Sequence, residues 1–195
     1  MRQANVNRKT NETNIDVTVN LDGSGNCAIQ TGIGFFDHML TQIAVHGLFD
    51  IEIAAQGDLD IDTHHTIEDV ALALGQAFSH ALGDRKGIRR MGQAAVPMDE
   101  ALCEVFVDLS GRPYSVFQGE WLAPNVGDIP VSLVEHFFYS LSMTLKANIH
   151  ANIRYGRDDH HKAEGLFKAL ARALSTAVQI DPRRADAVPS SKGVL

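Results

Sequence analysis

The 195-residue chain has few cysteines, no long apolar run and no excess of positive charge. Its two cysteines, Cys27 and Cys103, lack metal-ligand spacing; one disulfide is conceivable, but a reduced cytoplasmic protein is the expectation. No apolar run is long enough to span a membrane, and residues 1–14 lack the apolar core of a signal peptide. The formal net charge of -7 argues against a nucleic-acid or anionic-membrane partner, although local arginines and lysines can still bind an anionic substrate.

Histidine is abundant, and two histidine motifs are alike. The pattern His-His-x-x-Glu occurs at His64–Glu68 and again at His160–Glu164. On a helix, residues three or four apart share a face, whereas adjacent residues point about 100° apart. We therefore expect each His-His pair to serve two metal ions, one histidine to each. The plainer alternative is a pair of polar helix starts on the surface.

Apolar periodicity predicts the same order of elements in both halves of the chain. Strands are expected at 15–21, 27–30, 50–55, 100–109, 114–118 and 149–155, and helices at about 37–47, 64–83, 132–147 and 160–178. The stretch Glu100–Gly111 aligns with Glu12–Gly23 in its alternation. A capping box at Ser132–Glu135 is expected to open the third helix. The pattern indicates an internal duplication, with half-repeats at 1–90 and 91–180 and four helices packed between two small mixed sheets. From composition, 181–195 is as well explained by a disordered tail as by an ordered one.

The repeat also pairs two further histidines. Asp37-His38 precedes the first His-His motif at about the distance at which Glu135-His136 precedes the second. Imidazole and carboxylate donors without thiolate suit Mn, Fe or Zn, and oxygen-bearing substrates favour Mn. The predicted ligands of two ions are His38, His64, His65, Glu68, His136, His160, His161 and Glu164.

Basic residues suggest a phosphate site. Arg112 lies in a Gly-Arg-Pro turn and Lys192 follows two serines; arginine forks and hydroxyls suit a phosphate monoester. For Arg85, Lys86 and Arg89 a solvated basic face is the expectation. Spacing alone does not single out Arg90 or Arg112.

Several motifs together resemble one family. They are Thr10–Thr13, Gly34–Leu40, His46-Gly47, His64–Asp69, Val96–Ala101, Asp108–Tyr114, Asp159–Glu164 and Pro189–Gly193. Over essentially the whole chain they are similar to the imidazoleglycerol-phosphate dehydratase family of histidine biosynthesis. The chain departs from the family's usual pattern at Met91 and Gly165, neither of which removes a ligand.

The resemblance implies an α+β fold, internally duplicated, with two four-stranded mixed sheets flanking a four-helix bundle and halves like ribosomal S5 domain 2. It also implies a homo-oligomer of 24 subunits, two Mn²⁺ ions per active site at subunit contacts, and a hydro-lyase that converts imidazole glycerol phosphate to imidazole acetol phosphate. The implied catalytic residues are Glu12 and His46. The implied substrate contacts are Glu12, Gln42, His46, Arg90, Arg112, Lys168, Ser190, Ser191 and Lys192, which would make residues 190–192 a phosphate clamp, ordered with ligand.

Two other classes of protein remain open on the residues alone. A dinuclear metallohydrolase of phosphate esters would use the same ligands and release inorganic phosphate. A ferritin-like metal store would bind metal without turnover, although such bundles use Glu-x-x-His on long helices, without intervening strands.

Overall fold

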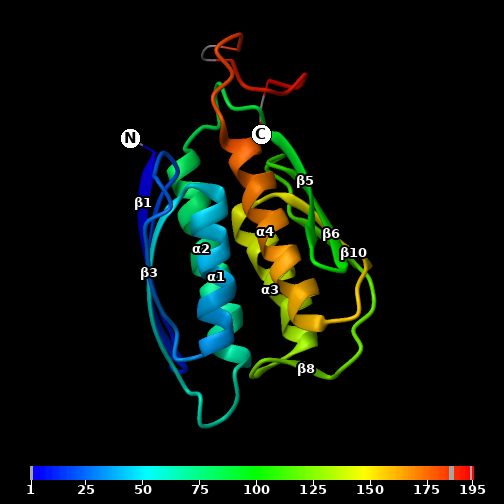
Figure 1. Ribbon diagram of the computed structural model, residues 1–195. Helices are drawn as coiled ribbons and strands as arrows, with labels where there is room; N and C mark the ends of the chain where they lie inside the picture. Colours follow the sequence, from blue (N-terminus) through cyan, green and yellow to red (C-terminus); the bar gives the residue numbers. More distant parts are fainter. Residues whose placement is uncertain (1, 185–186, 194) are drawn as a thin grey trace.

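Four helices lie between two four-stranded sheets in the computed structural model, which describes residues 2–184, 187–193 and 195 (Figure 1). The predicted tail therefore includes three residues outside the described part, at positions 185, 186 and 194. The duplicated α+β fold predicted from the sequence is confirmed. Its elements are β1 (Gln3–Lys9), β2 (Thr13–Asn20), β3 (Cys27–Gln30), α1 (Gly34–Gly47), β4 (Asp50–Gly57), α2 (His64–Leu82), β5 (Met91–Met98), β6 (Ala101–Asp108), β7 (Tyr114–Gln118), β8 (Asn125–Val126), β9 (Ile129–Pro130), α3 (Val131–Leu145), β10 (Asn148–Tyr155) and α4 (Asp159–Val178).

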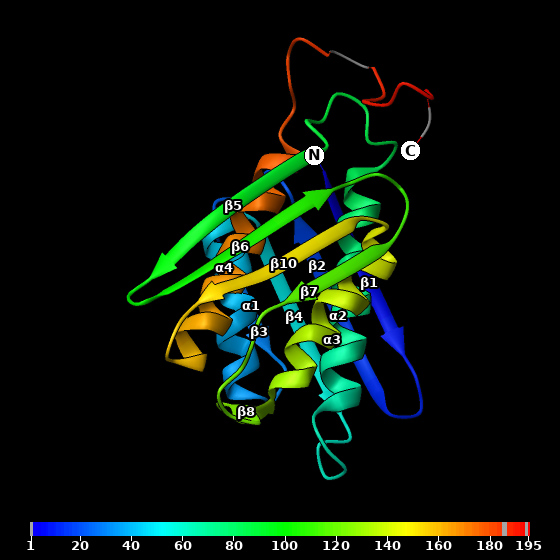
Figure 2. The ribbon, with the colours of Figure 1, turned by 90° about the vertical axis from the view of Figure 1, so that its right-hand side faces the viewer.

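The two large sheets have equivalent strand orders. The first runs β1-β2-β4-β3 and the second β5-β6-β10-β7, and in each the last pair is parallel while the others are antiparallel. On the inner face, β2 buries Ile15, Val17 and Val19, and β6 buries Cys103, Val105 and Val107. This alternation turns one face of each sheet toward the helices. Figure 2 shows the second sheet in front of the helical layer.

The helices pack in two pairs across the middle of the molecule. Helix α2 packs on α3 and α1 packs on α4, while α1 and α2 contact the first sheet and α3 and α4 the second. Gly75 permits the α2–α3 approach, since a Cβ there would lie 2.6 Å from the carbonyl oxygen of Leu141. The interior is therefore continuous between the halves, and elements from both halves meet in the helical layer.

Helix starts differ from the predictions in two places. The capping box expected at Ser132 is wrong: α3 begins at Val131 after Pro130, and no side chain caps it. Helix α1 begins at Gly34, three residues earlier than expected. Helix α4 does have a side-chain cap, because the Asp158 carboxylate accepts hydrogen bonds from the backbone amides of His160 and His161.

The expectation of a solvated Arg85 is also wrong. Its guanidinium is buried and donates to the carbonyl oxygens of Leu109, Leu145 and Lys146 at 2.7–3.1 Å. These carbonyls lie after β6 and at the end of α3, so Arg85 ties the first half to the second. Lys86 and Arg89 are exposed, as expected. Within the described residues, none of the helices combines the length and apolarity that a bilayer crossing requires.

Candidate metal centre

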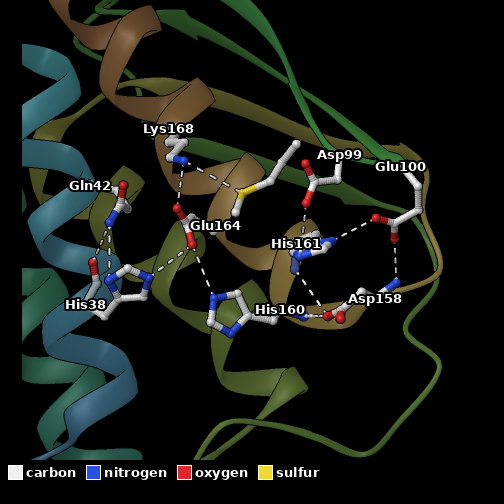
Figure 3. A network of polar contacts seen from close by, with 10 residues as sticks. His38, Gln42, Asp99, Glu100, Asp158, His160, His161, Glu164 and Lys168 are labelled. Carbon is white, nitrogen blue, oxygen red and sulfur yellow. Dashed lines mark hydrogen bonds and ion pairs between the residues drawn. The ribbon is translucent and has the colours of Figure 1, made fainter.

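One group of donors lies where α1 meets the start of α4, and we call it the α4 cluster: His38, His160 and Glu164 (Figure 3). One carboxylate oxygen of Glu164 lies 3.0 Å from His38 Nε2 and 3.2 Å from His160 Nε2. The other oxygen pairs with Lys168 Nζ at 2.7 Å. Burial alone would raise the pKa of Glu164, but hydrogen bonds from Lys168 and His38 outweigh it and hold the pKa at about 2. The carboxylate is therefore ionised and available to a cation at neutral pH.

The second group lies where α2 begins beside α3, and we call it the α2 cluster: His64, Glu68 and His136. Glu68 Oε2 lies 3.3 Å from His64 Nε2 and 3.2 Å from His136 Nε2. His136 Nε2 is buried and has no hydrogen-bond partner of adequate geometry among the described residues. A buried polar atom without a partner is costly. A metal ion that accepts this lone pair would remove the cost.

Each cluster draws on both halves of the chain. The α4 cluster takes His38 from the first half, and the α2 cluster takes His136 from the second. In each set the donor atoms lie within 4.8 Å of one another. Two imidazole nitrogens and a carboxylate in such a group fit a first-row transition metal and leave positions open for further ligands.

The other two predicted ligands, His65 and His161, lie outside these clusters. The rings of His64 and His65 are 6.2 Å apart at 75°, and those of His160 and His161 are 6.2 Å apart at 86°. His65 Nδ1 instead faces Asp58 at 3.0 Å, and His161 Nδ1 faces Glu100 at 2.7 Å. These hydrogen bonds raise the pKa of both histidines.

Four predicted substrate residues lie near one or another of the predicted ligands. The Gln42 amide nitrogen lies 3.3 Å from His38 Nδ1, and Glu12 lies 3.8 Å from His65 Nε2. Lys168 contacts Glu164 as described. Burial, with the positive charges of Lys168 and Arg172, lowers the pKa of His46, so that its imidazole favours the neutral form.

The predicted phosphate residues lie at the opposite end of the helical layer. Arg90 forms a two-fold ion pair with Asp108 at 2.6 and 2.9 Å and donates to the Pro189 carbonyl oxygen at 2.9 Å. It therefore adjoins Ser190, whereas Ser191, Lys192 and Arg112 are exposed. The Arg90 backbone amide donates a hydrogen bond to the carbonyl oxygen of Ala177, which lies near the end of α4. Glu164 lies near the start of the same helix. At about 1.5 Å per helical residue the two regions are roughly 20 Å apart along α4.

Sequence reasoning missed Asp58 and Glu100. Asp58 lies in the loop after β4, and nothing in its spacing indicates a histidine partner. Glu100 aligns with Glu12 in the repeat, but the alignment by itself indicates strands and not a histidine partner. In the structure Glu100 Oε1 also accepts the backbone amides of Arg157 and Asp158, both at 2.8 Å.

The fold and the paired clusters define a class of duplicated α+β enzymes with histidine–carboxylate sites. Comparisons with known proteins identify the family within it. The family described as imidazoleglycerol-phosphate dehydratase matches residues 31–174, and the chain belongs to this family. Since a dehydratase eliminates water, the chain is an enzyme of the hydro-lyase type.

Relatives and solved structures agree with this result. The chain is 54% identical to the imidazoleglycerol-phosphate dehydratase of Roseiflexus sp., over 100% of this chain and 98% of the relative. It is also 54% identical to the imidazoleglycerol-phosphate dehydratase of Chloroflexus aurantiacus, over 100% of this chain and 95% of that relative. The crystal structure of imidazoleglycerol-phosphate dehydratase from Staphylococcus aureus superposes on this chain with a TM-score of 0.83 at 34% sequence identity. The match covers 92% of this chain and 99% of that one. The crystal structure of the enzyme from Pyrococcus furiosus superposes with a TM-score of 0.84 at 35% sequence identity. This match covers 97% of this chain and 100% of that one.

Proposed function

We propose that the protein catalyses the Mn²⁺-dependent dehydration of imidazole glycerol phosphate to imidazole acetol phosphate in histidine biosynthesis, in the cytoplasm. The family match gives the reaction class, and relatives at 54% identity carry that substrate in their names. The observation that carries the metal dependence is the presence of two histidine–glutamate clusters in equivalent positions. We further propose half-repeats at 1–90 and 91–180, followed by a substrate-binding tail at 181–195.

The α4 and α2 clusters would each hold one ion. An ion held there would supply Lewis acidity, which would lower the pKa of the imidazole ring of the substrate and so favour loss of a hydroxyl from a carbon beside that ring. Such help is needed because the proton to be removed has no adjacent carbonyl to acidify it. The ligand set is His38, His160 and Glu164 in one cluster, His64, Glu68 and His136 in the other, with His65 and His161 added from neighbouring copies.

The distribution of residues supports an active site shared between copies of the chain. His65 and His161 are partly exposed, and their ring nitrogens face other carboxylates rather than the glutamate of the nearby cluster. The predicted phosphate residues are roughly 20 Å from the α4 cluster along α4, too far for one small substrate to contact both within a chain. Assembly into the 24-subunit oligomer would bring the complementary parts together at subunit contacts.

Chain residues other than the ligands would orient the substrate and move protons. Glu12, which lies near His65, and His46, whose pKa responds to the charges of Lys168 and Glu164, are the proposed acid–base pair; a neutral imidazole can accept a proton at neutral pH. Gln42 and Lys168 would contact the substrate beside the α4 cluster. Arg90, Arg112, Ser190, Ser191 and Lys192 would anchor its phosphate from a neighbouring copy and hold the reacting carbons in place.

The deciding experiment supplies metal-free protein with Mn²⁺ and imidazole glycerol phosphate and follows the ketone product. Metal-dependent formation of the ketone is expected. Release of inorganic phosphate without ketone would instead favour the metallohydrolase, and metal uptake without turnover would favour the metal store.

Replacing Lys192 with Ala should mainly weaken substrate binding at unchanged metal content; loss of metal would overturn its assigned role.

A further inference from the structure

His65 and His161 are held in the same way although their partners come from unrelated places in the chain. Asp58 lies in the loop before α2, and its two carboxylate oxygens are 3.0 and 3.2 Å from His65 Nδ1. Glu100 lies in the turn between β5 and β6, and its Oε2 is 2.7 Å from His161 Nδ1 (Figure 3). The alignment that places Glu12 opposite Glu100 does not place Asp58 opposite it, so the two halves reach this arrangement with different residues.

A carboxylate accepts hydrogen bonds and donates none, so it fixes the ring proton on Nδ1. The lone pair of the neutral ring is then on Nε2. In both histidines Nε2 is turned away from the holding carboxylate and toward a second, more exposed one: Glu12 at 3.8 Å for His65 and Asp99 at 3.7 Å for His161. The four histidines inside the clusters also direct Nε2 at their shared glutamate.

We propose that Asp58 and Glu100 are positioning residues that fix the tautomer and ring direction of His65 and His161, so that each presents Nε2 to a metal ion. The inference rests on the proposed function, because it takes these histidines to be ligands. Carboxylates that hold ligating histidines in this way commonly change metal affinity about 10- to 100-fold when they are removed. Neither residue would touch the ion or the substrate.

The surroundings of Glu100 make one substitution especially informative. Its Oε1 accepts two backbone amides, from Arg157 and Asp158. In Glu100→Gln the amide oxygen would keep those two bonds, which directs the NH₂ group at His161 Nδ1. The ring would then have to accept at Nδ1 and carry its proton on Nε2, which removes the lone pair needed by the metal. Asp58→Ala is the companion variant: the hydrogen bonds of the Asp58 side chain go to His65 alone within the described part of the chain, so an asparagine could turn its amide oxygen to Nδ1, whereas alanine removes the acceptor.

The test is a Mn²⁺ titration of the assembled protein, with thermal unfolding of the metal-free form measured alongside. Asp58→Ala and Glu100→Gln should each bind Mn²⁺ about 10- to 100-fold more weakly at an unchanged metal-free unfolding temperature. Asp58→Glu, which restores a carboxylate, should recover part of the affinity. The matched controls are Asp60→Ala, at an exposed residue of the same loop, and Glu104→Gln, at a residue that pairs with Arg154 on the same sheet. Both control variants should bind Mn²⁺ as the unmodified protein does.

Unmodified affinity in Asp58→Ala and Glu100→Gln would overturn the inference. So would weaker binding accompanied by an equal loss of metal-free stability and no recovery in Asp58→Glu, since the carboxylates would then be structural. Failure of the metal dependence in the proposed function looks different: the unmodified protein itself would then take up no Mn²⁺.

Discussion

The α4 and α2 clusters contain the same donors in different surroundings. The Glu164 side chain is 9% exposed and forms an ion pair with Lys168, whereas the Glu68 side chain is 38% exposed. Residue 72, equivalent to Lys168 by the spacing of the two motifs, is a leucine. The α2 cluster instead contains a buried His136 Nε2 without a hydrogen-bond partner. The duplicated halves thus share their ligand geometry but differ in charge, so the two ions should be bound with different strengths.

Removing either glutamate should have the largest effect. Glu164→Ala and Glu68→Ala each delete the carboxylate that two histidines face, so each should lose one ion per chain and more than about 100-fold in activity, beyond the effect typical of an outer partner. Metal analysis and the ketone assay measure both. Glu135→Ala, an exposed carboxylate beside His136, is the control. Full activity at normal metal content in either variant would show that the glutamate is not a ligand.

Replacing Arg85 tests whether the stability of the protein depends on the hydrogen bonds that this residue of the first half makes to the second half. Arg85→Met removes a buried guanidinium that serves three carbonyl oxygens, and should cost about 3 kcal/mol of stability. Thermal unfolding of the metal-free protein at fixed concentration measures the loss. Arg89→Met, an exposed neighbour, should have little effect. Equal stability of the two variants would mean that the seam between the halves does not need the guanidinium.

Lys168 and Leu72 allow the charge difference between the clusters to be reversed. Lys168→Met should strengthen Mn²⁺ binding at the α4 cluster, and Leu72→Lys should weaken it at the α2 cluster, each by about tenfold for a positive charge near the ion. Competition titration with a metal-binding dye resolves the two affinities. Changes in the same direction, or none, would contradict the electrostatic explanation.

The smallest effect concerns the two thiols. Burial raises the pKa of Cys103 to about 12, whereas Cys27 is exposed. A thiol reagent at pH 8 should therefore label one cysteine per folded chain and both after denaturation. Cys27→Ser is expected to abolish rapid labelling. Equal labelling rates for the two thiols in the folded protein would show that the interior of the second half opens readily.

Much of the fold followed from periodicity, and the failures have physical causes. The strands that alternate clearly, such as β2 and β6, were predicted from their apolar residues. Periodicity does not reveal β1, because Val6 is its one buried residue, or β5, because its one buried residue is Gly92, which has no apolar side chain. The capping box at Ser132 failed because Pro130 and Val131 set the start of α3 one residue earlier.

The sequence predicts those parts of the site that occur in both copies of the repeat. Matching the two His-His-x-x-Glu motifs and the two isolated histidines yielded the residues that the structure gathers into clusters. The pairing of Lys168 with Glu164 could have been inferred from their i, i+4 spacing on a helix. The pairing of Asp58 with His65 could not have been inferred from spacing, because the position of Asp58 depends on how a loop folds back on the start of α2. The roles of Arg90 and the tail came from the family resemblance alone and remain predictions.

The most direct test is anomalous diffraction at the manganese edge from crystals of the Mn²⁺-loaded protein. The account predicts two peaks per chain, one bounded by His38, His160 and Glu164 and one by His64, Glu68 and His136, each also contacted by His65 or His161 from a neighbouring copy. Peaks elsewhere, or no ordered peak at saturating Mn²⁺, would contradict it.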